Sequence, residues 1–309
     1  MSKICLCGTS MVDAPLNTKK SISFFEEAGI EFSAAENANL IISGTFTKIL
    51  ASILKFGSSK KYLIWTIEPR FNKFFNSNLS YPFLPEVHIM NVYTGIFDDN
   101  YFFVPMPLQE SRLDSKKTLG AGKRKVVSLM TYQSGRKWKF RHKGVDLDLC
   151  NLRTKIALEG HSRGLLDIYG RAWPKKISQG QSRGEGWRDR KMNILKNYNF
   201  TLCFENTNWP YYCTEKIWDA IKGGCLPIYY GKGNNIYEDF PKNSFLDYHD
   251  FNDANSLFDY IQNIKEEEFR ERMLLCIKVL KKAFQYKQEK NPYQRLLDKT
   301  LLKIKTILQ

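Results

Sequence analysis

The chain has 309 residues, of which 43% are hydrophobic and 26% charged, and its formal net charge is +15. This length predicts two domains with full hydrophobic cores. A mean hydropathy of −0.41 and the lack of any apolar run near about 18 residues argue against a transmembrane helix. The N-terminus lacks a secretory apolar segment, and the seven cysteines are scattered, so we expect a reduced, cytoplasmic protein without a disulfide framework.

The N-terminal half alternates short apolar runs with helix-like segments, which is typical of βαβ units and a mostly parallel sheet. The polar stretch 109–124 follows this half and is interpreted as a linker, so residues 1–118 are predicted to form the first domain. The expected strands are 3–9, 38–46, 61–67 and 101–108, and the expected helices are 19–28 and 47–56.

The second half repeats this alternation and predicts a second domain over residues 124–290. Pro292 breaks the chain, and residues 293–309 are expected to form a last amphipathic helix that packs back on the first domain. Two α/β domains joined by a linker leave a cleft between them, where small-molecule sites commonly lie. The expected strands are 125–132, 165–170, 199–205 and 225–231, and the expected helices are 151–162, 187–198, 214–224, 253–264 and 266–285.

The stretch FENTNWPYYCTEK, residues 204–216, lies between an expected strand and an expected helix. Thr214 is a good helix N-cap, and Glu215 and Lys216 fall in the first turn. Free backbone N–H groups and the helix dipole favour an anion at this place, and Lys216 adds a full positive charge. The pattern indicates a phosphate or diphosphate site, and the alternative is an ordinary capped helix with surface charges.

The net positive charge fits three kinds of partner: nucleic acid, an anionic membrane surface or a phosphorylated small molecule. One basic stretch runs from Arg171 to Lys196. Neither a Cys/His finger nor an aromatic RNA-binding string accompanies it, which disfavours nucleic acid. A solvated basic face is the alternative interpretation of this stretch.

Asp146-Leu147-Asp148 has the Asp-x-Asp form that binds a metal ion and a diphosphate in one large class of glycosyltransferases. No clear strand precedes it, and so short a pattern arises often by chance. The four histidines are far apart, and none has metal-ligand spacing with a cysteine. The sequence therefore predicts no metal site.

The segment from FENT (204–207) through YCTEK (212–216) resembles the α-1,3/1,4-fucosyltransferases of glycosyltransferase family 10. Pro227, Gly231 and the pair Ser244-Phe245 continue the resemblance, which is dense over about fifty residues. A weaker similarity extends back to Arg153 and to DIYGRAW, residues 167–173.

The resemblance implies a GT-B fold, in which two Rossmann-like domains face each other across a cleft. It also implies inverting transfer of L-fucose from GDP-β-L-fucose to a hydroxyl of an N-acetyllactosamine-like glycan, in an α-1,3-type linkage and without a catalytic metal or other cofactor. Three alternatives stay open: another GDP-sugar donor, a catalytically inactive glycan-binding relative, and a nucleic-acid-binding protein.

The resemblance assigns roles to several residues of the second domain. Lys216 and Arg153 would hold the diphosphate, since cationic side chains suit phosphate oxygens. Glu215 would hold the ribose of the nucleotide, at a helix start capped by Thr214. Trp187 is a candidate for stacking on guanine, with a core tryptophan as the alternative. Glu205, Asn206 and Tyr212 would line the pocket for fucose and nucleotide.

The first domain would supply the base that takes the acceptor proton. Glu68 follows an expected strand and is the candidate, although the family has a residue between this glutamate and the proline, and here Pro69 follows directly. Asp98 and Asp99 are the alternative bases. The lysines of the C-terminal region offer contact with an anionic membrane surface, and packing of the last helix on the protein is the alternative.

Overall fold

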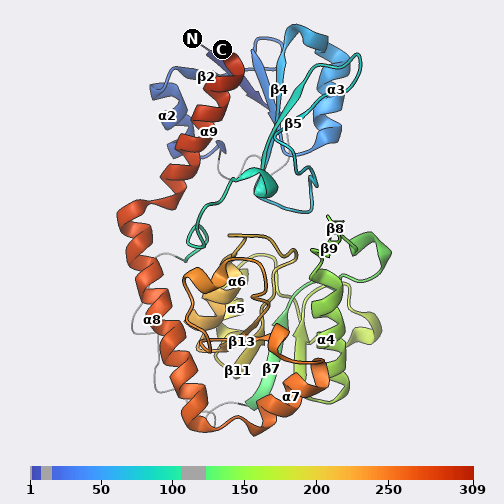
Figure 1. Cartoon of the computed structure of the whole chain (residues 1–309), viewed down its shortest axis with the longest axis vertical. Coiled ribbons are helices and arrows are strands. Elements are labelled where there is room, and N and C mark those ends of the chain that lie inside the picture. Colours follow the sequence, from blue (N-terminus) through green and yellow to red (C-terminus); the bar gives the residue numbers. More distant parts are fainter. Residues whose placement is uncertain (1, 8–15, 106–122) are drawn as a thin grey trace. The chain divides into compact units, whose positions relative to one another are not determined.

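The computed structural model describes residues 2–7, 16–105 and 123–309. The chain divides into two compact units, each with its own mostly or wholly parallel sheet (Figure 1). Unit 1 comprises Met1–Asp98 and Asn291–Gln309, and unit 2 comprises Asp99–Lys290. The last helix therefore belongs to the same unit as the N-terminal residues.

Unit 1 is built on a six-stranded sheet in the order β2-β1-β3-β4-β6-β5. All neighbouring strands are parallel except β5, which runs antiparallel to β6. The strands are β1 (Ser2–Leu6), β2 (Ile30–Phe32), β3 (Leu40–Ser43), β4 (Lys61–Thr66), β5 (Asn78–Leu79) and β6 (Val87–Asn91). The helices are α2 (Lys19–Glu27), α3 (Phe46–Phe56) and α9 (Pro292–Leu308).

Local signals explain the helices of unit 1. The Thr18 side chain caps α2 by accepting a hydrogen bond from the Ser21 amide at 3.1 Å. Helix α9 buries one apolar face, which includes Leu296 and Ile304. The buried Trp65 in β4 donates its indole N–H to Thr300 Oγ1 of α9 at 3.2 Å. The last helix thus packs on its own unit, and the expected membrane contact stays a prediction.

The boundary between the units differs from the predicted one at residue 118. Unit 2 already begins at Asp99, because the side chain of Asn100 donates to Asp239 Oδ2 at 2.7 Å. The Tyr101 hydroxyl also donates to Asp239, and its ring lies in the core of unit 2. Residues 101–105, the described part of the expected strand 101–108, form no strand. Most of the expected linker 109–124 falls outside the described residues, and its last two residues open β7.

Unit 2 contains a five-stranded parallel sheet in the order β10-β7-β11-β12-β13 and a small two-stranded sheet. The strands are β7 (Lys123–Leu129), β8 (Arg141–His142), β9 (Val145–Asp146), β10 (Leu166–Tyr169), β11 (Tyr198–Leu202), β12 (Leu226–Tyr229) and β13 (Leu246–Asp247). The helices are α4 (Cys150–Ser162), α5 (Trp187–Leu195), α6 (Glu215–Lys222), α7 (Ala254–Asn263) and α8 (Glu266–Lys290).

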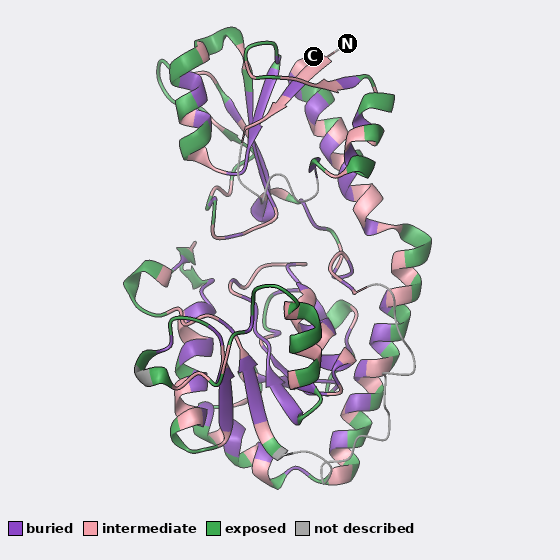
Figure 2. Ribbon diagram, turned by 180° about the vertical axis from the view of Figure 1, so that it is seen from behind, coloured by how far each residue is buried: buried purple, intermediate pink, exposed green. Residues whose placement is uncertain are grey.

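The strands of unit 2 are largely buried, while its helices expose their outer sides (Figure 2). The larger core joins the sheet to helices α4, α6, α7 and α8. A smaller cluster, which includes Val127, Leu195 and Tyr198, lies between the opposite face of the sheet and α5. Helices on both sides are the usual way to cover a parallel sheet.

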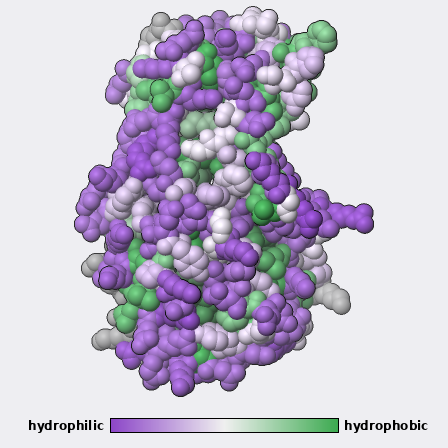
Figure 3. Space-filling model, viewed as in Figure 1, coloured by the Kyte–Doolittle hydropathy of each residue, from purple (hydrophilic) through white to green (hydrophobic). Residues whose placement is uncertain are grey.

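The described helices include none that is both long and apolar enough to cross a membrane. On the face of the molecule in Figure 3, hydrophilic residues predominate and hydrophobic ones are scattered among them. This pattern is ordinary for the surface of a folded protein in water.

Candidate active site

The segment 203–214 lies between the end of β11 and the start of α6. In the sheet of unit 2, β11 is the central strand, with β7 on one side and β12 on the other. The carboxyl ends of the strands in an open parallel sheet are where ligands bind. The motif singled out in the sequence therefore lies at the expected edge of the sheet.

Glu205 is a buried anion that joins the end of β11 to the start of α6. Its side chain is 1% exposed, and its Oε1 accepts the Thr214 amide at 2.7 Å. The Thr214 hydroxyl and the Lys216 ammonium group lie 2.7 and 2.8 Å from Oε2. A carboxylate can be buried at this depth because charged and hydrogen-bonded partners surround it. Glu205 therefore faces protein groups, whereas the resemblance assigns it to the wall of the ligand pocket.

Lys216 lies at the edge of this cluster, with its side chain 24% exposed. Burial lowers the pKa of the Lys216 ammonium group, but the nearby charges of Glu205 and Glu215 outweigh that effect and raise it. Lys216 is therefore charged at neutral pH. Its position in the first turn of α6 places this charge beside the free backbone N–H groups of the helix.

Arg153 reaches the same cluster from α4 and is 6% exposed. Its guanidinium group donates to the carbonyl oxygen of Phe204 at 3.2 Å and to Gln133 Oε1 at 2.5 Å. Because both side chains are positively charged, Arg153 repels Lys216 and by itself lowers the pKa of the Lys216 ammonium group. Among the described residues, the buried Nε of Arg153 has no hydrogen-bond partner. The structure thus brings together two cations, Arg153 and Lys216, that are 63 positions apart in the sequence.

Glu215 is the other acidic residue at the start of α6, and its side chain is 35% exposed. Burial raises the pKa of its carboxyl group, but the charges of Lys216 and Lys191 overcome this, and the pKa falls to about 2. Glu215 is thus ionised and accessible, as a residue that binds a ribose hydroxyl would be. Thr214 is the N-cap of α6, but its side chain makes no capping bond because Glu205 takes it.

The remaining candidates of unit 2 lie at different depths. Tyr212 is buried at 3% exposure, and Asn206 is half-buried. The Asn206 carbonyl accepts the Leu149 amide at 3.3 Å, which fastens the motif to the start of α4. Trp187 opens α5 and is half-buried, and the Lys191 ammonium group lies 5.9 Å from its ring centroid. Trp187 is therefore neither a core residue nor part of the Glu205 cluster.

The Asp-x-Asp pattern serves the fold. Asp148 Oδ1 accepts the Cys150 amide at 3.0 Å, and Oδ2 accepts the Asn151 amide at 3.1 Å. Asp148 thereby satisfies first-turn amides of α4, the helix that carries Arg153. Within residues 2–7, 16–105 and 123–309, no group of three or more His, Cys, Asp or Glu side chains is arranged to hold a metal ion.

Glu68, the candidate base, lies in unit 1 just after β4 and is half-buried. Its amide donates to Thr66 Oγ1 at 3.1 Å, and the next carbonyl, of Pro69, accepts the Tyr93 hydroxyl at 2.6 Å. These bonds hold the backbone around Glu68 in one conformation.

The two alternative bases are engaged by other groups. Asp98 pairs with Arg295, and its Oδ2 lies 2.9 Å from Lys299 Nζ. Burial raises the pKa of the Asp98 carboxyl group, but its bonds to Lys299 and Arg295 lower it overall. Asp99 accepts the Tyr101 amide at 2.8 Å and belongs to unit 2. A carboxylate with a depressed pKa is a weak base, so Asp98 suits proton abstraction poorly.

Residues 150–275 match a family model described as the C-terminal domain of glycosyltransferase family 10 (fucosyltransferase). An alpha-(1,3)-fucosyltransferase FucT of Helicobacter pylori is 43% identical over 72 residues, which are 23% of this chain and 15% of that protein. The 3-galactosyl-N-acetylglucosaminide 4-alpha-L-fucosyltransferase FUT3 of Pan troglodytes is 31% identical over 126 residues, 40% of this chain and 31% of that protein. The matches thus span less than a third of the length of these relatives.

Solved structures extend the similarity to the whole fold. A crystal structure of an alpha1,3-fucosyltransferase has a TM-score of 0.52 at 19% identity, and the alignment covers 99% of this chain and 90% of that one. A structure of such an enzyme with GDP-fucose has a TM-score of 0.50 at 20% identity, with 100% and 90% coverage. The predicted fold class, α/β of the GT-B type, is confirmed.

Proposed function

We propose that this chain, whose residues 150–275 belong to glycosyltransferase family 10, is an enzyme that transfers L-fucose from GDP-β-L-fucose to a hydroxyl of a glycan. The family match supports this proposal, as does the transfer of fucose named for both relatives. GDP-fucose is the ligand named for a solved protein of the same fold.

The observation that carries the proposal is the cluster of Arg153, Glu205 and Lys216 at the start of α6. Two cations and the free N–H groups of a helix converge there, which is an arrangement suited to a diphosphate. Glu205 holds Lys216 in place, and the Phe204 carbonyl holds Arg153. A site that is fixed before the ligand arrives loses little entropy on binding.

In the proposed reaction, a hydroxyl oxygen of the acceptor attacks the anomeric carbon of fucose, and the bond from that carbon to the diphosphate oxygen breaks. The negative charge that develops on GDP is stabilised by Lys216 and Arg153. The hydroxyl proton passes to the Glu68 carboxylate as the new bond forms. Attack from the side opposite the diphosphate inverts the configuration, which gives an α-linked product from the β-linked donor.

We also propose that the linkage is of the α-1,3 type, that the acceptor is an N-acetyllactosamine-like glycan, and that the reaction needs no metal ion. Arg153 and Lys216 would stabilise the diphosphate through charge-assisted hydrogen bonds, in the role that a divalent cation has in metal-dependent enzymes. A second candidate keeps the same site and reaction but uses another GDP-sugar.

The test is a transfer assay with the full chain, N-acetyllactosamine and EDTA. GDP-fucose should give a product heavier by one fucose in the mass spectrum, and NMR spectroscopy of that product should show an α-1,3 linkage. Transfer from GDP-mannose in preference to GDP-fucose would establish the second candidate. A protein that binds GDP but transfers neither sugar would be a catalytically inactive relative, and one that does not bind GDP would reject both candidates.

A further inference from the structure

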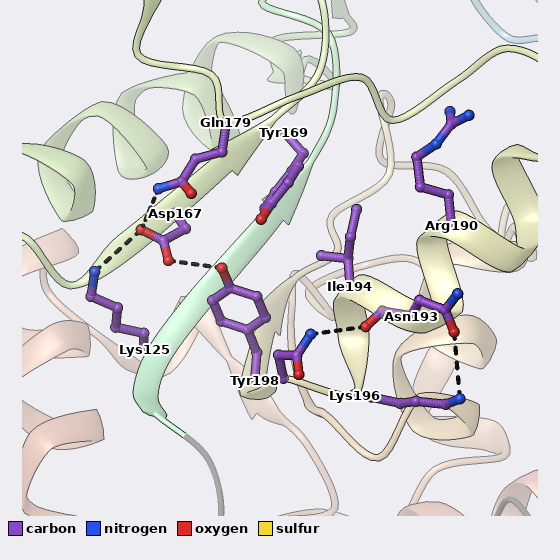
Figure 4. Close-up of a pocket in the computed structure, with 10 residues that line it drawn as sticks. Lys125, Asp167, Tyr169, Gln179, Arg190, Asn193, Ile194, Lys196 and Tyr198 are labelled. Atoms are coloured by element: carbon purple, nitrogen blue, oxygen red, sulfur yellow. Dashed lines mark hydrogen bonds and ion pairs between the residues drawn. The ribbon is translucent and has the colours of Figure 1, made fainter.

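Unit 2 contains a second concave site, a groove of about 940 Å³ between the sheet and α5 (Figure 4). Its lining comes from β7, β10, β11, α5 and the loop between β10 and α5. It shares no residue with the cluster of Arg153, Glu205 and Lys216. Pockets that hold drug-sized molecules commonly have volumes of roughly 300–1,000 Å³, so a di- or trisaccharide would fit.

The groove exists because one face of the parallel sheet is incompletely covered. Helix α5 packs against the part of that face that contains Val127 and Tyr198. Toward the edge strand β10, the lining consists of Lys125, Asp167 and Tyr169. Both faces of a parallel sheet are normally apolar and covered by helices. Polar side chains on this face of the sheet are therefore unusual and suggest a function other than packing.

Asp167 forms the floor of the groove and is 6% exposed. Its Oδ1 lies 3.2 Å from Lys125 Nζ and accepts a hydrogen bond from Gln179 Nε2 at 3.2 Å. Its Oδ2 accepts the Tyr198 hydroxyl at 2.8 Å. The carboxylate is thus satisfied and holds these three side chains in position, as the dashed lines in Figure 4 show. The Lys125 side chain remains 34% exposed and has N–H groups left for a ligand.

The groove carries a positive charge beyond this pair. Arg190 and Lys196 line it from α5 and the residue that follows α5, so three cations stand against one carboxylate. Both belong to the basic stretch from Arg171 to Lys196, and neither has a role in the proposed transfer reaction. Figure 4 shows Arg190 on the opposite side of the groove from Asp167 and Tyr169.

The rest of the lining is suited to hydroxyl groups. Gln179, Asn193 and Asn197 offer amide groups that both donate and accept, and Tyr169 offers an aromatic ring. A pyranose ring presents hydroxyls at its edge and an apolar C–H surface on its faces, so amides and an aromatic ring together match it.

We propose that this groove is a second, non-catalytic site that binds an anionic saccharide, a sugar that carries a carboxylate or a phosphate. The anionic group pairs with Lys196, the sugar hydroxyls bond to the amides, and one face of the ring packs on Tyr169. Arg190 adds positive charge at the rim, where its guanidinium group donates to the carbonyl oxygens of Arg183 and Glu185 at 3.2 and 3.0 Å. Asp167 orients Lys125 and Gln179 for these contacts. Such a site would hold a charged glycan chain on the enzyme independently of the transfer step.

Titration calorimetry with the full chain tests the proposal, with 3′-sialyllactose as the carboxylate probe, galactose 6-phosphate as the phosphate probe and lactose as the neutral one. We expect at least one anionic probe to bind more tightly than lactose, and its affinity to fall as salt is added. The anionic probe that binds more tightly shows whether the groove prefers a carboxylate or a phosphate. Equal affinity for all three probes, or no binding of either anion, would overturn the proposal.

Two charge reversals place the binding in the groove. Lys196 is exposed, and its ammonium group donates a long hydrogen bond of 3.5 Å to Asn193 Oδ1, so Lys196→Glu leaves the core intact. Lys278→Glu makes the same change at an exposed position of α8 that does not line the groove. Lys196→Glu should lower the affinity for the anionic probe by about five-fold or more, since repulsion replaces attraction. Lys278→Glu should leave that affinity unchanged. Equal losses in both variants would mean general attraction to a basic protein and would contradict the proposal.

A second variant and a fold control complete the test. Lys196→Gln removes the charge without reversing it and should cause a smaller loss than Lys196→Glu. Affinity for GDP, measured on the same samples, should stay unchanged in all three variants, because the groove is separate from the start of α6. If both Lys196 variants keep full affinity for the anionic probe, the groove is not its site.

Discussion

The ammonium group of Lys216 lies 2.8 Å from Oε2 of Glu205, and the Glu205 side chain is only 1% exposed. The two residues are eleven positions apart: Glu205 lies in the segment that follows β11, and Lys216 lies in the first turn of α6. The attraction between the two charges offsets part of the cost of burying them. The pair therefore links the stability of unit 2 to the position of the cation that we assign to the diphosphate.

The first prediction concerns the stability of this pair. Glu205→Gln should lower the free energy of unfolding of unit 2 by about 3 kcal/mol, because it removes the buried carboxylate beside Lys216 and leaves that cation with the more distant Glu215, at 4.0 Å. This figure is at the lower end for a buried pair, since the Lys216 side chain is 24% exposed. Urea unfolding measures the change. Glu238→Gln is the matched control, because Glu238 is exposed and bonded to the Tyr211 hydroxyl. Equal effects of the two substitutions would contradict the assignment.

The second prediction concerns GDP. Lys216→Ala and Arg153→Ala should each weaken GDP binding in EDTA by roughly ten- to hundred-fold, the loss of a charge-assisted hydrogen bond. Lys222→Ala changes a lysine at the other end of α6 and should leave the affinity unchanged. Titration calorimetry measures all three. If GDP bound only after Mn²⁺ was added, the proposal that these cations replace a metal would fail.

Some of this site is visible in the sequence, because its signals are local. The structure has α6 at Glu215–Lys222, close to the predicted 214–224, since Thr214 begins the helix and Gly223 and Gly224 end it. The strand predicted at 199–205 is β11, Tyr198–Leu202. The clustering of Arg153 with Lys216 followed from the family resemblance, since no local pattern joins residues so far apart.

The parts that the sequence did not reveal depend on long-range packing. Strand β6, Val87–Asn91, was not predicted, because its five residues include the polar His88 and Asn91 and it is formed by pairing with β4. The burial of Glu205 also depends on tertiary structure, because Thr214 and Lys216 must fold back onto it. The groove residues Lys125 and Asp167 face each other only once β7 and β10 pair.

The third prediction is a pH dependence caused by Glu215. The pKa of its carboxyl group is about 2 in the folded protein, against an ordinary value of 4.5. The unfolded chain therefore binds more protons in this interval, and the stabilisation is complete above about pH 4.5 and is lost as the pH falls toward about 2. Glu215→Gln lacks this contribution.

Urea unfolding of both proteins at about pH 6 and about pH 3 tests this dependence. The parent should be more stable than Glu215→Gln at the higher pH, and the difference should shrink at the lower one. Because the side chain is 35% exposed, solvent screening reduces the size of the effect. A difference that stays constant between the two pH values would show that the Glu215 carboxyl group is not held ionised by Lys216 and Lys191.

The last prediction concerns the base. Glu68 follows β4 of unit 1, and the Thr66 and Tyr93 hydroxyls hold its loop through backbone bonds. Glu68→Gln keeps the shape of the side chain and removes its basicity, so the transfer rate should fall by about 10²–10⁴. Affinity for GDP should not change, because the proposed base takes a proton from the acceptor and does not contact the nucleotide.

Asp98→Asn provides the comparison for Glu68→Gln. Asp98 is paired with Arg295 and Lys299, which lower its pKa below the ordinary range, so it should contribute little as a base. We therefore expect Asp98→Asn to retain most of the transfer rate. Measuring transfer and GDP affinity on the same samples separates the possible outcomes. Full activity in Glu68→Gln together with lost activity in Asp98→Asn would move the base to Asp98, and a Glu68→Gln protein that no longer binds GDP would show that Glu68 supports the fold.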